Sequence, residues 1–164
     1  MKCFSHLCTY WTMSDKFIKY TGLVPKIKAL IDKEIGLVGN LANTSAAIKE
    51  EFGFLWVGFY LVEGNELLLG PFQGPVACTR IARGRGVCGK SWEMDKALVV
   101  DNVHEFADHI PCSDKANSEI VLPVHDQDSN VKLVMDIDSV DLAAFDDTDV
   151  QYLGEIVKEI ESLL

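Results

Sequence analysis

The sequence has little cysteine, no long apolar run and few basic side chains. Its 164 residues include five cysteines. An odd number of cysteines with no Cys-x-x-Cys pair does not fit a secreted domain stabilised by disulfides. Reduced cytosolic thiols are therefore expected. No apolar stretch approaches the length of a membrane-spanning helix. Lys plus Arg number 15 against 25 Asp plus Glu, a net charge of −10, which argues against nucleic acid and anionic membranes as partners.

The length and composition fit one globular domain. Hydrophobic residues make up 48% of the chain and charged residues 24%, as in proteins that fold around a single core. The segment from Met1 to Thr12 lacks the apolar region and the small-residue cleavage site of a secretion signal. We therefore predict a disordered extension over residues 1–13, a single domain over 14–164 and a cytoplasmic location, with no role for Cys3 and Cys8.

Hydrophobic spacing predicts helices at both ends of the domain. Apolar residues at helical spacing run from Leu23 to Ile35, from Leu41 to Phe52 and from Val150 to Leu164. Gly53 is a suitable end for the second helix, and Asp146 is a suitable cap for the third.

Strands are predicted where β-branched and aromatic residues dominate. They are expected at Phe54 to Val62, Glu66 to Phe72, Val76 to Ala82, Ala97 to Asp101, Ser118 to His125 and Val131 to Asp138. Polar turns between them predict hairpins. The fold class is therefore α+β, a central antiparallel sheet flanked by N-terminal helices and a C-terminal helix. We also expect a brief helix or turn from Lys90 to Lys96 and a long loop from Asn102 to Asn117, of the kind that often carries function.

The glycine-rich segment from Gly84 to Ser91 matches both G-x-G-x-x-G and the phosphate-loop pattern G-x-x-x-x-G-K-[ST]. A phosphate loop needs a buried parallel strand before it and a helix after it. Arg80 and Arg83 interrupt the preceding strand, and too few residues separate Ser91 from the next strand for a crossover helix. The context therefore argues against a nucleotide site.

A metal site would gather His104, His109 and Cys112, with Cys78 or Cys88 as a further candidate ligand, because imidazole and thiolate suit Zn²⁺. Their spacing matches no established zinc pattern. We therefore expect no metal ion.

Three thiols inside the predicted domain, Cys78, Cys88 and Cys112, suggest redox chemistry. Cysteine is usually buried and inert, but Cys112 lies between Pro111 and Ser113 in a polar loop. Thiol redox enzymes need one nucleophilic thiol and a second that can reach it. The residues alone leave open which thiol has which role.

Carboxylates and aromatic rings could complete a site around these thiols. Asp136 and Asp138 alternate on one predicted strand and so share a face, and Glu119 opens the neighbouring strand. Clustered carboxylates raise one another's pKa and can remain protonated, although a solvated sheet face would have the same pattern. Trp56 and Tyr60 share a face of the first strand and would suit either a core or a pocket.

Several segments together resemble one family. They are WVGFY from Trp56, GPFQGPVACTRI around Cys78, GRGVCGKSW around Cys88, HIPCS around Cys112, SEIVLP at Glu119 and DIDS from Asp136. From about Leu23 onward the chain resembles the free methionine-(R)-sulfoxide reductases, which are stand-alone GAF-domain enzymes. The resemblance implies a GAF fold, a homodimer, and reduction of the R epimer of free methionine sulfoxide.

The resemblance also implies a role for each thiol. It implies three catalytic cysteines: Cys112 matches the nucleophile, Cys78 the resolving thiol and Cys88 the third cysteine of the family. Cys112 would become a sulfenic acid and then form a disulfide with Cys78. Thioredoxin, or dithiothreitol in vitro, would reduce that disulfide, and no bound cofactor is implied.

The resemblance further implies a substrate pocket. The residues that match it are Trp56 and Tyr60 for the methyl group, and Glu119, Asp136 and Asp138 for the amino group and proton transfer. The alternative is a non-catalytic GAF sensor of a small molecule such as a cyclic nucleotide, which would have no use for three thiols.

Overall fold

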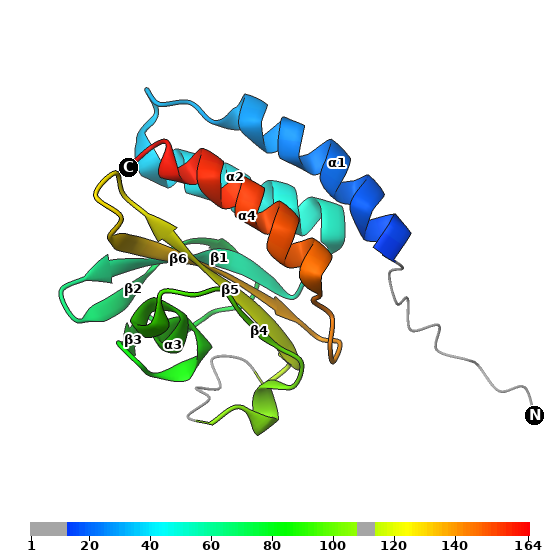
Figure 1. Cartoon of the computed structure of the whole chain (residues 1–164), viewed down its shortest axis with the longest axis vertical. Coiled ribbons are helices and arrows are strands. Elements are labelled where there is room, and N and C mark those ends of the chain that lie inside the picture. Colours follow the sequence, from blue (N-terminus) through cyan, green and yellow to red (C-terminus); the bar gives the residue numbers. More distant parts are fainter. Residues whose placement is uncertain (1–12, 108–113) are drawn as a thin grey trace, which may run out of the picture.

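One curled sheet organises the domain, and the structure, a computed structural model, describes residues 13–107 and 114–164 (Figure 1). Its six strands lie in the order β3-β2-β1-β6-β5-β4, and all their pairings are antiparallel. The strands are β1 (Trp56–Glu63), β2 (Glu66–Gln73), β3 (Arg80–Ala82), β4 (Leu98–Val100), β5 (Ser118–His125) and β6 (Val131–Ser139). The predicted α+β fold with a central antiparallel sheet is confirmed.

Helices cover the two faces of the sheet unequally (Figure 1). The helices α1 (Met13–Leu30), α2 (Gly36–Phe52) and α4 (Asp147–Glu161) lie on one face, and the short α3 (Gly86–Met94) lies on the other. A 3-10 turn, η1, spans Val103–Glu105. No helix in the described part of the chain is long and apolar enough to cross a membrane.

Alternate residues of each central strand enter different cores, because successive side chains point to opposite faces. Val57 and Phe59 of β1 join the large core under α1, α2 and α4. Trp56 and Tyr60 of the same strand join a smaller core under α3, together with Cys88. The predicted site residues of β1 therefore lie on the face with the thinner cover.

The first helix differs from its prediction at both ends. It spans Met13–Leu30 rather than Leu23 to Ile35. Its buried side includes Lys16 and Tyr20. A lysine in a core position interrupts the apolar spacing from which a helix is predicted. The helix ends early because the buried amide of Asn40, on α2, makes hydrogen bonds with the backbone of the turn that follows.

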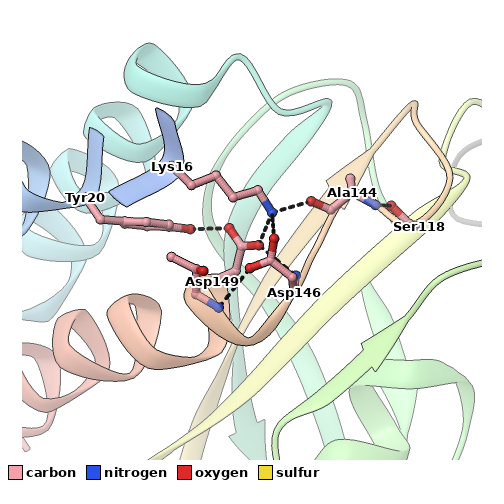
Figure 2. A network of polar contacts seen from close by, with 7 residues as sticks. Lys16, Tyr20, Ser118, Ala144, Asp146 and Asp149 are labelled. Carbon is pink, nitrogen blue, oxygen red and sulfur yellow. Dashed lines mark hydrogen bonds and ion pairs between the residues drawn. The ribbon is translucent and has the colours of Figure 1, made fainter. Parts of the chain in front are cut away.

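A buried ion-pair network, here called the Lys16 network, holds α1 against the start of α4 (Figure 2). It consists of Lys16, Asp146 and Asp149. Lys16 Nζ donates to Asp146 Oδ2 at 2.8 Å and to Asp149 Oδ2. Tyr20 Oη donates to Asp149 Oδ1 at 2.7 Å. Asp146 and Asp149 also form a capping box on α4, which confirms the predicted Asp146 cap.

The Lys16 network also reaches the sheet. Lys16 Nζ donates to the carbonyl of Ala144 at 2.8 Å, and the N–H of Ala144 donates to Ser118 Oγ at 3.3 Å (Figure 2). Ser118 is the first residue of β5 and immediately precedes Glu119. The helical layer is thereby tied to the end of the strand that carries one of the predicted site carboxylates.

The elements around the glycine-rich segment were predicted wrongly. The helix after it begins at Gly86 rather than Lys90, and the strand before it begins at Arg80 rather than Val76. That strand, β3, pairs antiparallel with β2 at the edge of the sheet. A phosphate loop would require a buried parallel strand at this point, so the observed context agrees with the argument against a nucleotide site.

The glycines of this segment have backbone explanations. Gly84 and Gly86 have φ values of +76° and +60°, which residues other than glycine rarely adopt. A Cβ on Gly89 would lie 2.5 Å from the carbonyl oxygen of Ala82. The segment is glycine-rich because it turns sharply and packs α3 directly on the backbone.

Candidate active site

Strand register places the predicted carboxylates beside the predicted aromatic residues. Asp138 of β6 lies opposite Trp56 of β1 and opposite Glu119 of β5, which makes one row across three strands. In the next row, Asp136 lies opposite Gly58. Side chains two residues apart share a face, so both rows belong to the face that α3 covers.

The aromatic side chains stack over β1 and β2. The ring centroids of Trp56 and Tyr60 are 5.8 Å apart, and those of Trp56 and Phe72 are 5.2 Å apart. A Cβ on Gly58 would lie 2.4 Å from Cη2 of Trp56, so the missing side chain there lets the indole lie flat. Phe72 and Gly58 were not predicted as site residues, although a glycine inside an aromatic strand is a known sign of close packing.

A thiol and two carboxylates meet beside these rings, and we call Cys88, Glu119 and Asp136 the Cys88 cluster. Their ligand atoms, one from each residue, all lie within 4.8 Å of one another. The Cys88 thiol donates to Glu119 Oε1 at 3.8 Å. The three residues are 3%, 6% and 6% exposed, so they are almost completely shielded from water.

The Cys88 cluster has no basic partner in the part of the chain that the structure describes. None of the ion pairs there includes Glu119, Asp136 or Asp138. Asp136 Oδ1 is buried and has no hydrogen-bond partner among the same residues, and the same holds for the indole Nε1 of Trp56. Buried polar atoms are normally hydrogen-bonded, so one acceptor and one donor are left for a ligand.

Burial controls the protonation of these carboxyl groups. Burial raises the pKa of Asp136 to about 6, although hydrogen bonds with Cys88 and Glu119 act to lower it. Burial, and then the charges of Asp136 and Asp138, raise the pKa of Glu119 well above its ordinary value. Burial and the charge of Asp136 likewise raise the pKa of the half-buried Asp138. Burial therefore favours the protonated form of each of these carboxyl groups.

The same environment keeps Cys88 as a neutral thiol. Burial raises the pKa of Cys88, and the charges of Asp136 and Glu119 raise it further. A nucleophilic cysteine requires the thiolate and usually has a lowered pKa. Cys88 is thus placed as a hydrogen-bond donor to Glu119, in surroundings that disfavour it as the attacking group.

The other predicted thiols are placed only in part. Cys78 lies half-buried between β2 and β3 and takes part in a disulfide. Tyr60 Oη donates to its backbone carbonyl at 3.0 Å, which ties the segment of Cys78 to the aromatic stack. Cys112, the predicted nucleophile, lies outside the described residues.

The alternative metal group of the sequence is likewise placed only in part. His104 lies on η1, exposed, with Nε2 3.0 Å from Oδ1 of Asn117. His109 lies outside the described residues, as does Cys112. Among the described residues, a metal-capable group is found at the Cys88 cluster, which shares only Cys88 with that hypothesis.

Comparisons with known proteins first define the class. No protein-family model matches the chain. It is 50% identical over 145 residues to GAF domain-containing protein A of Dictyostelium discoideum, covering 88% of this chain and 91% of that protein. A solved structure of a GAF domain superimposes with a TM-score of 0.85 at 32% identity, covering 99% of this chain and 97% of the other. The domain is therefore a GAF domain, as predicted.

Two further relatives define the family. The chain is 42% identical over 146 residues to free methionine-R-sulfoxide reductase of Escherichia coli, covering 88% of each protein. The X-ray structure of free methionine-R-sulfoxide reductase from Neisseria meningitidis in complex with its substrate superimposes with a TM-score of 0.87 at 45% identity, covering 97% of this chain and 95% of that one. The chain belongs to the free methionine-R-sulfoxide reductase family and is an oxidoreductase, which confirms the predicted family.

Proposed function

We propose that this protein reduces free L-methionine-(R)-sulfoxide to methionine through its thiols. The observation that carries the proposal is a group of carboxyls, the buried Glu119 and Asp136 with the half-buried Asp138, beside the stacked rings of Trp56 and Tyr60. Buried charge needs a partner of opposite sign. The α-ammonium of a free amino acid supplies that partner, whereas a residue inside a peptide lacks it. The substrate's methyl group would pack against the two rings.

The proposed first step is attack by the Cys112 thiolate on the sulfoxide sulfur. A carboxylic acid of the site protonates the oxygen as the sulfur–oxygen bond breaks, because a poor leaving group needs general acid catalysis. The hydroxyl so released bonds to the Cys112 sulfur as the transient bond between the two sulfurs breaks, so methionine departs with two more electrons on its sulfur and Cys112 holds the oxygen as a sulfenic acid. Glu119 is the best-placed acid, because its pKa is raised by burial and by two neighbouring carboxylates.

The proposed second step regenerates the thiols. The sulfenic acid of Cys112 condenses with the Cys78 thiol, which forms a disulfide and releases water. An external dithiol, thioredoxin in the cell or dithiothreitol in vitro, then reduces this disulfide by exchange. The cycle uses no bound cofactor. The disulfide at Cys78 and the hydrogen bond from Tyr60 to its backbone support a resolving role for this thiol.

In this mechanism Cys88 is not a member of the disulfide cycle. Its thiol is free, buried and hydrogen-bonded to Glu119. We propose that it holds the Glu119 carboxyl in position for the substrate. This refines the sequence-based expectation, which counted Cys88 among the catalytic cysteines.

The decisive experiment is turnover of free methionine-(R)-sulfoxide with dithiothreitol or thioredoxin. We expect methionine formation by the wild type and by Cys3→Ser, and none by Cys112→Ser. N-acetylmethionine sulfoxide, which lacks the α-ammonium, should not be reduced. An inactive wild type whose melting temperature rises with a cyclic nucleotide would instead favour the GAF sensor, and an active Cys112→Ser would move the nucleophile to another thiol.

The assembly and the compartment also belong to this proposal. The resemblance implies a homodimer, and α1 leaves Phe17 and Ile18 51% and 64% exposed, which provides apolar surface for a second copy. Light scattering on the purified chain tests this state. The cytoplasm stays the predicted location, because thioredoxin keeps thiols reduced there.

A further inference from the structure

We propose that the Cys88 cluster also binds a thiophilic divalent cation of the Zn²⁺ or Cd²⁺ kind, at the position that the proposed function gives to the substrate's ammonium group. The cluster brings together one sulfur and two carboxylate oxygens from three separate elements, α3, β5 and β6. Three protein ligands with a fourth position left for water or substrate are the usual arrangement of a catalytic zinc site.

The spacing of the ligand atoms suits such an ion. Zinc takes sulfur at about 2.3 Å and carboxylate oxygen at about 2.0–2.2 Å, so tetrahedral ligands lie about 3.5 Å apart. Cys88 Sγ lies 3.8 Å from Glu119 Oε1, and all three ligand atoms fall within 4.8 Å of one another. Small side-chain rotations would therefore bring the three atoms into contact with one ion.

An independent observation points to a missing ligand at this place. Asp136 is 6% exposed, and its Oδ1 atom has no hydrogen-bond partner among the described residues. The cluster also lacks an ion pair with any described Lys, Arg or His. Buried carboxylates are normally paired with a cation or coordinate a metal, and no described side chain supplies that cation.

The chemistry of the donors selects the class of metal. Mg²⁺ and Ca²⁺ prefer sites made only of oxygen, whereas a sulfur ligand favours Zn²⁺ and its relatives. On binding, a metal–sulfur bond replaces the S–H bond of Cys88, and metal–oxygen bonds replace any O–H bond of the two carboxyl groups; these protons pass to solvent with no change of oxidation state. The cation would fill the site without taking part in the redox cycle, and it would therefore act as a reversible inhibitor.

The test is a titration of the reduced full-length chain with Cd²⁺, followed by the ultraviolet charge-transfer absorption of the cadmium–thiolate bond. The Cys112→Ser variant is used as the parent, so that the proposed nucleophile does not contribute. We expect a saturable absorption with one equivalent of Cd²⁺. It should be lost in Cys88→Ser and retained when Cys3 and Cys8 are both replaced by Ser. Absorption that survives Cys88→Ser, or none in the parent, would overturn the proposal.

A second variant separates loss of a ligand from loss of folding. Asp136→Asn keeps the thiol but removes one charged oxygen, so Cd²⁺ should still give the thiolate absorption with an affinity lowered by more than about tenfold. Unchanged affinity would overturn the assignment of Asp136 as a ligand. Circular dichroism of each variant verifies the fold.

Competition between methionine sulfoxide and Cd²⁺ tests whether the metal site overlaps the proposed substrate site. The metal site and the proposed function can still be tested separately. Free methionine sulfoxide should raise the apparent dissociation constant of Cd²⁺ for the Cys112→Ser parent, and equal affinity at saturating sulfoxide would contradict a shared position. The absorption titration itself requires no turnover. A wild type that binds Cd²⁺ through Cys88 but reduces no sulfoxide would refute only the proposed function, and an active enzyme that binds no Cd²⁺ would refute only the metal site.

Discussion

The two faces of the sheet each hold a group of carboxylates with at least one buried member, and the groups differ in whether a basic side chain lies among them. On the helical face, Asp146 and Asp149 surround the ammonium of Lys16. On the α3 face, Glu119 and Asp136 lie beside a neutral thiol with no basic partner among the described residues. The first group holds α1 on α4, whereas the second leaves a place that a cationic ligand can fill.

The pKa values reflect this difference. Burial acts to raise the pKa of Asp146, but hydrogen bonds with Lys16 and Thr148 lower it overall. Burial raises the pKa of Asp136 to about 6, and its hydrogen bonds do not offset this. A carboxyl group beside a lysine and a buried carboxyl group without a basic partner thus have pKa values shifted in opposite directions.

The largest effect is expected from removing the cation of the paired group. Lys16→Met should lower the free energy of unfolding by about 3–5 kcal/mol, because it leaves Asp149 buried without a charge partner. Urea denaturation measures this change. Lys26→Met, on the same helix, removes an exposed pair with Glu50 and should change stability little. Equal stability of the two variants would contradict the importance of the Lys16 network.

Removing a charge from the unpaired group should affect catalysis instead. Glu119→Gln should lower kcat/KM for free methionine-(R)-sulfoxide by about 100-fold or more, because it removes a proton donor and a partner of the ammonium. Its urea midpoint should not fall. Glu63→Gln, at an exposed end of β1, is the matched control and should keep full activity. A Glu119→Gln enzyme of normal kcat/KM would exclude this residue from the site.

Neutralising Asp136 should stabilise the ligand-free protein at alkaline pH. Its folded-state pKa is raised to about 6, so its contribution to stability is fully present below the unfolded pKa of about 4 and is lost as pH rises through about 6. The free energy of unfolding of Asp136→Asn should therefore exceed that of the wild type by about 2 kcal/mol at pH 8, with no gain at pH 4. Urea denaturation with EDTA present measures both. Asp149→Asn should instead be destabilised at pH 8.

The smallest effect on stability is expected at His125, a cation that titrates near neutral pH and lies between two carboxylates. His125 hydrogen-bonds Asp95 Oδ1 at 2.7 Å and Glu161 Oε1 at 2.9 Å. Burial acts to lower the pKa of His125, but these two partners raise it overall. The stabilisation is thus present below about pH 6.5 and is lost as pH rises through the folded-state pKa. His125→Gln should lower stability by less than about 1 kcal/mol at pH 6. Thermal unfolding should show a smaller difference at pH 9.

Local patterns predicted the strands of the site well and the helices near it poorly. The alternation of Asp136 and Asp138 placed both on one face, and β5 has its predicted bounds, Ser118–His125. The start of α3 was missed because Gly86 and Gly89 lower helix propensity, although the positive φ of Gly86 and the close packing of Gly89 require glycine there. The first helix was misplaced because Lys16 occupies a core position.

The sequence by itself determined the sheet, the family and the set of chemically active side chains, because period-two alternation and short motifs are local properties of the chain. It did not determine which buried acids would have a cation. Lys16 meets Asp149 across 133 residues, and Cys88 meets Glu119 across 31. Only the packing of helices on the two faces of the sheet brings such distant groups together, and that packing gave a lysine to one group of carboxylates and a neutral thiol to the other.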